Sequence, residues 1–487
     1  LPPAPPPVRA LSPAFKQTLM AAALKLIETE QQRGVRRNLC HLVAAFAASL
    51  GGATTASAAS AASGQQAAAV GGAGGAVPLA QAWPALLPAT LAYAQSASQP
   101  GLRESGLYLL SILGEYCQLA LRAAAQQVFS CLGACYQQAA AGGGGAAASA
   151  FSADAKALLV KSTTGFLLAL QPEHLSAGVP LMQPMMQILS ALLASGDELA
   201  AREAMDGLVE MAVDQGVAKF MSASMVHLVM AMVQIAGSTA LDTQTRILAL
   251  EVVCSLAENR PGLLRKMGAD KTGAVVRVCI EMAAELECDG TRDDPNWDMN
   301  TFQEMDDDEG QDSVSGMALE AIGRLGVKLG GRVVLPQAFA MIPAMIADGT
   351  DWRKRRAGIL CLANVSGGAI KMLKPELGKV LAMFLPRLQD SVQRVRFAAA
   401  MSVGLLCQAF DGEMQSAHHA AVVPALSQAL RAAAQSGSCP RVRGAAANSV
   451  ITVFRGAAEE EGGGAAGGSE ADAFVDGSAT SSATAAG

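Results

Sequence analysis

Long apolar runs, each preceded by a turn and an arginine, recur along the chain. Three of them, DWRKRRAGILCLANV, VQRVRFAAAMSVGLL and PRVRGAAANSVITVF, share one order of features: turn, arginine, small residues, almost wholly apolar segment. If Arg355, Arg396 and Arg443 are equivalent, the copies lie 41 and 47 residues apart. Intervals of roughly 40 to 47 residues are typical of two-helix HEAT or armadillo repeats. The pattern therefore predicts stacked pairs of antiparallel helices.

The position shared by Arg355, Arg396 and Arg443, which we call the arginine slot, also recurs toward the N-terminus. Further copies place Arg246, Arg202, Lys161, Arg103 and either Arg36 or Arg37 in it. One more unit, residues 315–331, lacks the arginine. A uniform repeat favours one continuous solenoid over several separate domains. The predicted fold is all-α, a right-handed HEAT-repeat superhelix of antiparallel helix pairs.

The helix expected over 243–257 shows how such units pack. After Arg246 its polar positions are Glu251, Ser255 and Glu258, at steps of four and three residues, so they form one polar line on an apolar rod. The expected partner helix, 224–235, has a similar line. A rod of this kind must be covered by neighbours on several sides, so stacking is predicted to stabilise the array.

Changes in composition set the expected boundaries. We predict a disordered Pro-rich lead (1–13), a first HEAT unit (14–50), a Gly/Ala/Ser insertion (51–78), HEAT repeats (79–290) with a shorter Gly/Ala insertion (139–150), an acidic loop (291–313), further repeats (314–457) and a disordered tail (458–487). Low-complexity Gly, Ala and Ser segments cannot offset the entropy of ordering.

Composition narrows the class further. Aromatic residues make up only 4% and alanine is abundant, so the core must depend on close contacts between small side chains and Leu, Met and Val. A net charge of −6 counts against general binding to nucleic acid or an anionic membrane, and favours a basic partner. No window reads as a membrane span, so no membrane insertion is expected. The ten cysteines form no CxxC pair and read as buried residues of a reducing compartment.

The segment ELECDGTRDDPNWDMNTFQEMDDDEGQDSVSG interrupts the repeat with a dense negative charge. Its acidic residues include Asp293, Asp294, Asp298, Glu304, Asp306, Asp307, Asp308, Glu309 and Asp312, against one cation. Such a run repels itself and will not fold alone. It can be a solvated loop without a role. A calcium loop is disfavoured, since the spacing and the sixth-position glycine of an EF-hand are missing. The third interpretation is electrostatic capture of a basic partner, which Trp297 and Phe302 favour.

Catalytic and cofactor motifs do not emerge. The glycine-rich runs do not lead into Gly-Lys-Ser or Gly-Lys-Thr, and GxSxG and HExxH are absent. His418 and His419 have no matching ligand cluster. We therefore predict a protein that is not an enzyme and needs no cofactor or metal.

Several segments together resemble the importin-beta (karyopherin) family of nuclear transport receptors, most closely its importin beta-3 branch. These are ALEVVCSLAE, the acidic insertion with Trp297, ALEAIGRLGVKLGGRVVLP, DWRKRRAGILCLANV and VQRVRFAAAMSVG. The resemblance covers roughly residues 11–454 and is most specific over 318–404. The resemblance implies a start near the family's third repeat and an end about half way through, so we expect a fragment that lacks the first repeats and the C-terminal half.

The resemblance implies a shuttling import receptor of the cytoplasm and nucleus. It would bind basic nuclear localisation signals on a concave face of second helices, contact Phe-Gly nucleoporins and release cargo on binding the Ran GTPase with GTP. The acidic loop would contact Ran or cargo, with Asp306, Asp307, Asp308 and Glu309 foremost, and Glu281 and Glu285 would lie on the cargo face. We expect a monomer. The alternative is a HEAT scaffold or regulatory subunit of an enzyme complex, such as a protein phosphatase.

Overall fold

Helices account for nearly all of the regular structure. The computed structural model describes residues 11–50, 78–141, 151–286, 313–435 and 439–462, and these ranges contain no strand. The predicted all-α class is confirmed. The chain forms two compact units, one with the described residues from 11 to 372 and one with those from 373 to 462.

Two kinds of helix alternate in the first unit. The first helices, which carry the slot position near their start, are α2 (Arg33–Leu50), α5 (Pro100–Tyr116), α8 (Ala153–Ala169), α10 (Glu198–Val213), α13 (Thr243–Asn259), α18 (Val314–Leu329) and α20 (Trp352–Leu373). The second helices are α4 (Leu86–Ala94), α7 (Ala125–Ala141), α9 (Val179–Ala194), α12 (Met225–Ala236), α15 (Ala269–Ala283) and α19 (Gly331–Ile346). Helix α1 (Pro13–Thr29) precedes them, and the short elements α3 (Leu79–Ala82), α6 (Gln118–Ala123), η3 (Leu175–Gly178), α11 (Gln215–Phe220), η4 (Met221–Ala223) and α14 (Pro261–Arg265) lie in the connections.

Local sequence signals start several first helices. The hydroxyl of Ser152 accepts a hydrogen bond from the amide of Ala155, and Asp242 accepts one from Gln244. Each satisfies a backbone donor that has no partner inside the helix. Pro100 stands at the first position of α5, where its missing amide costs nothing.

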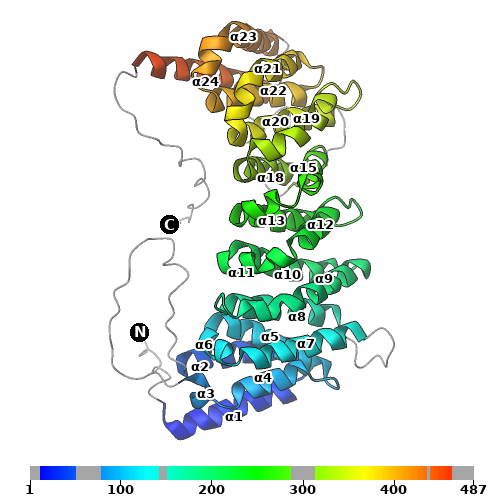
Figure 1. Cartoon of the computed structure of the whole chain (residues 1–487), viewed down its shortest axis with the longest axis vertical. Coiled ribbons are helices and arrows are strands. Elements are labelled where there is room, and N and C mark those ends of the chain that lie inside the picture. Colours follow the sequence, from blue (N-terminus) through cyan, green and yellow to red (C-terminus); the bar gives the residue numbers. More distant parts are fainter. Residues whose placement is uncertain (1–10, 51–77, 142–150, 287–312, 436–438, 463–487) are drawn as a thin grey trace, which may run out of the picture. The chain divides into compact units, whose positions relative to one another are not determined.

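Consecutive first helices pack against one another, from α2 through α5, α8, α10 and α13 to α18 (Figure 1). Small residues let the helices of this stack approach one another closely. A Cβ atom on Gly114 of α5 would lie 2.7 Å from the carbonyl oxygen of Gly165 in α8. A Cβ on Gly368 of α20 would lie 2.1 Å from the carbonyl carbon of Gly326 in α18. The expected core of small side chains is therefore a requirement of backbone contact between helices.

The arginine slot has a clear physical role. Arg103, Arg246 and Arg355 are each the fourth residue of their helix. Their guanidinium groups donate to the carbonyl oxygens of Ser96 (2.9 Å), Ala236 (2.8 Å) and Asp348 (3.0 Å), which lie at the end of the preceding helix or in the following turn. Carbonyls at a helix end lack partners within the helix. The arginine therefore supplies a hydrogen-bond donor to carbonyl oxygens where one helix pair joins the next.

Two sequence assignments need correction. Lys161 is not in the slot, because α8 begins at Ala153 and its fourth residue is Lys156, whereas Lys161 is exposed further along the helix. Arg202 is not in the slot either, because it is the fifth residue of α10 and donates to Asp242 at 2.9 Å. Residues 14–50 form α1 and α2, which pack against each other, and Arg36 is the fourth residue of α2.

The second unit repeats the same plan. It contains η6 (Lys374–Glu376), α21 (Leu377–Phe384), η7 (Leu385–Gln389), α22 (Gln393–Ala409), the π-helical turn η8 (Met414–His418), α23 (His419–Gln435) and α24 (Pro440–Gly462). Arg396 donates to the carbonyl oxygen of Asp390 at 2.7 Å, as the slot requires. Helices α22 and α24 pack closely, and the buried hydroxyl of Ser449 donates to the carbonyl oxygen of Ala400 at 2.6 Å.

One apolar segment differs from the expectation that no window reads as a membrane span. Residues 175–194 are long and apolar enough to cross a bilayer by length and composition, with a mean hydropathy of 1.3. This is weak evidence, because core helices pass the same test. Most of the segment is α9, which packs on α7, α8 and α10 as a second helix of the stack.

Candidate functional site: the anchors of the acidic segment

The acidic segment leaves the stack after α15 and rejoins it at α18. The residues predicted to contact partners lie outside the described residues; they are Asp293, Asp294, Asp298, Asp306, Asp307, Asp308, Glu309 and Asp312. The two ends of the segment are described, and their contacts define where it starts and finishes.

The N-terminal end is fixed by an arginine fork. Both carboxylate oxygens of Glu285 accept from the guanidinium of Arg246, at 2.6 and 2.7 Å, while Nε of Arg246 donates to the carbonyl oxygen of Ala236 at the end of α12. Arg246 is 5% exposed. Paired charge-assisted bonds of this geometry are among the strongest in proteins. Glu285, predicted to lie on the cargo face, therefore has an internal partner and a structural role.

The C-terminal end returns to the same place. The hydroxyl of Ser315 in α18 donates to the carbonyl oxygen of Ala283 in α15 at 2.8 Å. Arg356 of α20 donates to the same hydroxyl at 3.2 Å, and Ser313 caps α18 through the amide of Gly316. Residues 287–312 thus begin and end at a joint between α15 and α18.

Glu281 lies differently from Glu285. It is exposed on α15, one turn after the exposed Arg277. Its carboxylate is accessible, so its place on a cargo-binding face stays a prediction.

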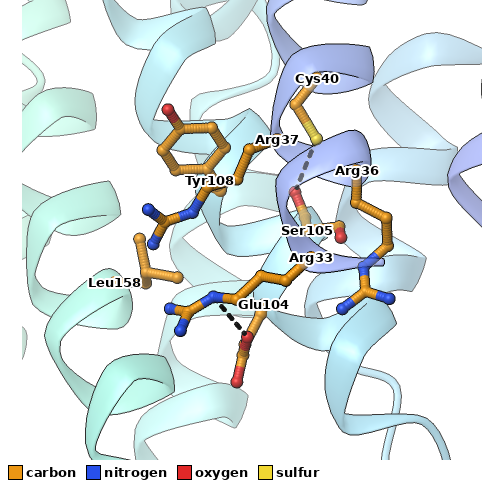
Figure 2. A pocket seen from close by; sticks show the side chains of 8 residues that line it. All are labelled: Arg33, Arg36, Arg37, Cys40, Glu104, Ser105, Tyr108 and Leu158. Carbon is orange, nitrogen blue, oxygen red and sulfur yellow. Dashed lines mark hydrogen bonds and ion pairs between the residues drawn. The ribbon is translucent and has the colours of Figure 1, made fainter. Parts of the chain in front are cut away.

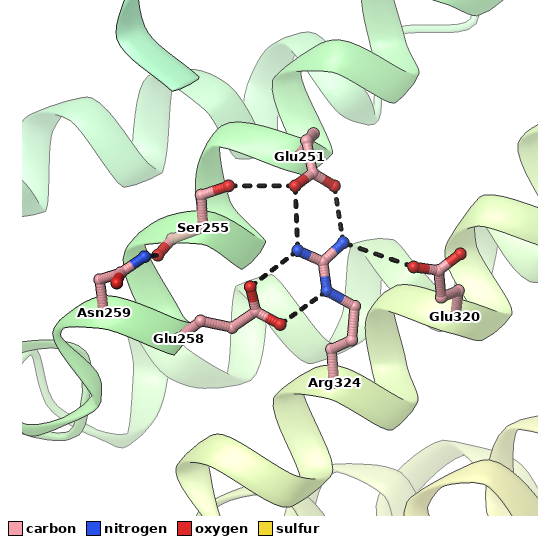
Figure 3. Close-up of polar contacts among 6 residues, drawn as sticks. All are labelled: Glu251, Ser255, Glu258, Asn259, Glu320 and Arg324. Atoms are coloured by element: carbon pink, nitrogen blue, oxygen red, sulfur yellow. Dashed lines mark hydrogen bonds and ion pairs between the residues drawn. The ribbon is translucent and has the colours of Figure 1, made fainter. Parts of the chain in front are cut away.

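A second arginine, Arg324, joins α13 and α18, the first helices that precede and follow α15 in the sequence. Arg324 of α18 donates to Glu251 of α13 at 2.7 and 2.9 Å and to Glu258 of α13 at 2.8 and 3.0 Å. The hydroxyl of Ser255 donates to Glu251 at 3.0 Å, and Glu320 lies 3.6 Å from the guanidinium (Figure 3). We call Arg324, Glu251 and Glu258 the Arg324 clamp.

The hydrogen bonds of the clamp shift the pKa values of Glu258 and Arg324. Hydrogen bonds from Arg324 lower the pKa of Glu258 below its usual value, more than burial raises it. The same bonds raise the pKa of Arg324, with Glu251 contributing most. Arg324 and Glu258 therefore keep their charges at physiological pH, and the clamp joins α13 to α18.

Sequence reasoning found only one side of the clamp. The polar line of Glu251, Ser255 and Glu258 was recognised, but Arg324 was missed. The signal was available: residues 315–331 lack the slot arginine yet carry one in the middle of an otherwise apolar helix.

The described residues offer little chemistry. Within the described ranges no group of three or more His, Cys, Asp or Glu side chains is placed to hold a metal ion. Burial raises the pKa of Cys117 to about 11 and that of Cys40 to about 12, with Arg36 opposing the latter. These two thiols stay protonated at neutral pH and are poor nucleophiles.

Comparisons with known proteins agree with this architecture. A family model described as "Importin repeat" matches residues 238–336, which include the whole Arg324 clamp. "Importin subunit beta-3" of Saccharomyces cerevisiae is 29% identical over 187 residues, covering 38% of this chain and 16% of that protein. "Probable importin subunit beta-4" of Schizosaccharomyces pombe is 30% identical over 125 residues, covering 24% of this chain and 11% of that protein. The matches thus span well under two thirds of either relative.

Solved structures extend the likeness to the whole fold. The crystal structure of Kap121p superposes with a TM-score of 0.72 at 21% identity, covering 92% of this chain and 38% of that one. Kap121p bound to Nup53p gives 0.73 at 22% identity with the same coverage. The fold is a HEAT-repeat α-solenoid, as predicted. The family model and the curated relatives thus make parts of the chain similar to importin-beta karyopherins.

Proposed function

We propose that this chain is part of a nuclear import receptor that binds basic nuclear localisation signals on the surface of its second helices. It contacts Phe-Gly nucleoporins, releases cargo on binding Ran with GTP, and moves between cytoplasm and nucleus as a monomer without a cofactor. Similarity to importin-beta karyopherins supports this, as do structures of the similar Kap121p bound to Nup53p and to Pho4p.

The observation that carries the binding role is the joint beneath the acidic segment. Ser315 and Ala283 bring the two ends of 287–312 together, and the Arg246–Glu285 pair fixes the point of departure. A densely negative segment at a defined place on a rigid stack favours a positively charged partner. Asp306, Asp307, Asp308 and Glu309 are the proposed contacts, with Glu281 on the neighbouring second helix.

Transport is favoured over the scaffold alternative because the family model and both curated relatives are importins. That family is one of transport receptors, not of enzymes.

The test is release of cargo by nucleotide-loaded Ran. A basic localisation-signal peptide is bound to the immobilised full-length protein, and Ran loaded with GTP or GDP is added. We expect Ran with GTP to release the peptide and Ran with GDP to leave it bound. Equal release by both forms would contradict the proposal, as would failure of the peptide to bind.

A further inference from the structure

Two cysteines lie one turn apart on α7, on the side of the helix that faces α4. Cys131 is 2% exposed and Cys135 is 0% exposed, and among the described helices α7 alone carries two cysteines. Residues four apart on a helix share a face. The Sγ atom of Cys131 lies 3.7 Å from the carbonyl oxygen of Leu91. That of Cys135 lies 3.5 Å from the carbonyl oxygen of Ala94. Both sulfurs therefore meet the C-terminal part of α4.

The two thiols also contact each other. A sulfur–sulfur hydrogen bond joins them and lowers the pKa of Cys131 more than burial raises it, and the side chain of Gln95 lowers that pKa further. The same bond keeps the pKa of Cys135 above its usual value. A single buried thiol behaves differently, since that of Cys40 donates to the carbonyl oxygen of Ser105 at 3.6 Å (Figure 2). In the pair a proton lies between two sulfurs, and metal binding replaces such protons.

The spacing of the pair decides which chemistry it supports. Cβ atoms four residues apart on a helix are about 5–6 Å apart. A disulfide needs about 3.5–4.5 Å between its Cβ atoms, so closing one here would have to bend α7. Zinc takes four ligands, and within the described ranges no group of three His, Cys, Asp or Glu side chains is placed to hold a metal ion. Two metal–sulfur bonds of about 2.3 Å in line need sulfurs about 4.6 Å apart, which the helix spacing allows.

We propose that Cys131 and Cys135 bind one Cu(I) ion, in linear coordination between their sulfurs. Thiolate ligands favour this soft ion over harder ones. Binding forms two copper–sulfur bonds and releases two thiol protons to solvent, and copper keeps its oxidation state. The two thiolates and the ion carry one net negative charge. The guanidinium of Arg103, which is 1% exposed, favours the thiolate of Cys135 and offsets this charge.

The surroundings of the pair suit a bound ion. Burial of both sulfurs excludes water from it, as apolar shells do around other metal sites. The side chain of Gln95, which contacts Cys131, belongs to an exposed residue directly after α4. This side chain marks the entry path that a buried metal site requires.

This inference goes beyond the proposed function, because it concerns an ion and not a protein partner. It involves α4 and α7, and neither α15 nor α18, which anchor the acidic segment. A failure to bind copper leaves cargo release by Ran unaffected, so the two proposals can be told apart.

The test is an anaerobic titration of the reduced full chain with Cu(I) supplied as its bicinchoninate complex, whose colour reports the copper that the chelator keeps. We expect the wild type to withdraw one equivalent. Cys131→Ala and Cys135→Ala should each bind Cu(I) at least about tenfold more weakly, because one sulfur is lost. Cys407→Ala, at a buried cysteine of α22, and Cys288→Ala, in the acidic segment, should withdraw as much as the wild type.

X-ray absorption of the copper-loaded wild type needs no variant, and we expect two sulfur ligands. Failure of the wild type to withdraw copper would overturn the proposal, as would an equivalent that survives both Cys131→Ala and Cys135→Ala. Copper with three sulfur ligands, or loss of binding in Cys288→Ala or Cys407→Ala, would also overturn it, because the ion would then lie elsewhere.

Discussion

Arg324 and Glu251 form two parallel hydrogen bonds, at 2.7 and 2.9 Å, between helices that are separated in sequence by α15 and the acidic segment. Glu258 closes the clamp from the same helix. Charged contacts also join other first helices, as Arg33 of α2 and Glu104 of α5 do, but in the clamp one arginine holds two carboxylates of the facing helix. The clamp therefore fixes the two layers from which the acidic segment departs.

Replacing Arg324 by glutamine should destabilise this part of the stack. Two carboxylates would lose their partner, and since 23% of the Arg324 side chain is exposed, solvent offsets part of the loss. We expect the opening free energy of α13 and α18 to fall by about 1–3 kcal/mol. Hydrogen exchange read by mass spectrometry measures it, with Arg332→Gln as the matched exposed control. Unchanged protection of α13 and α18 would contradict the role of the clamp.

The same clamp should make the stability of the folded chain depend on pH in the acid range. The pKa of Glu258 in the folded chain lies below its usual value of 4.5, so its contribution is present above about pH 4.5 and is lost as pH falls through the folded pKa. The melting temperature of the wild type should exceed that of Arg324→Gln by a constant margin from pH 6 to 8. Below pH 4.5 the margin should shrink. A margin that grew in acid would show the opposite linkage.

Gly368 should tolerate no side chain. Alanine there would place its Cβ 2.1 Å from the backbone of Gly326, so α18 and α20 would have to separate. We expect Gly368→Ala to cost roughly 1–3 kcal/mol, as overpacking does. Its neighbour Gly367 has open space around the Cβ position, and Gly367→Ala should be neutral or slightly stabilising. Equal melting temperatures for the two variants would show that the close approach does not limit packing.

The repeat could be predicted from sequence because one physical need returns in several of the helix pairs. A turn leaves carbonyls without partners, and an arginine at the fourth position of the next helix satisfies them, as Arg246 and Arg355 do. Where this need is met differently the register was misassigned. Lys161 stands beside small residues like a slot residue, yet α8 starts eight residues before it at Ala153.

The site was less predictable because its partners are distant in sequence. Glu251 and Glu258 formed a visible line, but their partner Arg324 lies more than sixty residues away, and only the stacking of α13 on α18 brings it close. Glu285 was predicted to lie on a cargo face, and its pairing with Arg246 was not predicted because it depends on how the chain leaves α15 beside α13.

The central claim, that the anchored acidic segment captures basic partners, is tested by neutralising it. A basic localisation-signal peptide is titrated over a range of salt concentrations into the full-length protein and into a variant with Asp306→Asn, Asp307→Asn, Asp308→Asn and Glu309→Gln. A control variant carries Glu459→Gln, Glu460→Gln and Glu461→Gln. We predict weaker binding and a shallower salt dependence in the first variant alone. Affinity and salt dependence that stay at wild-type values in that variant would contradict the claim.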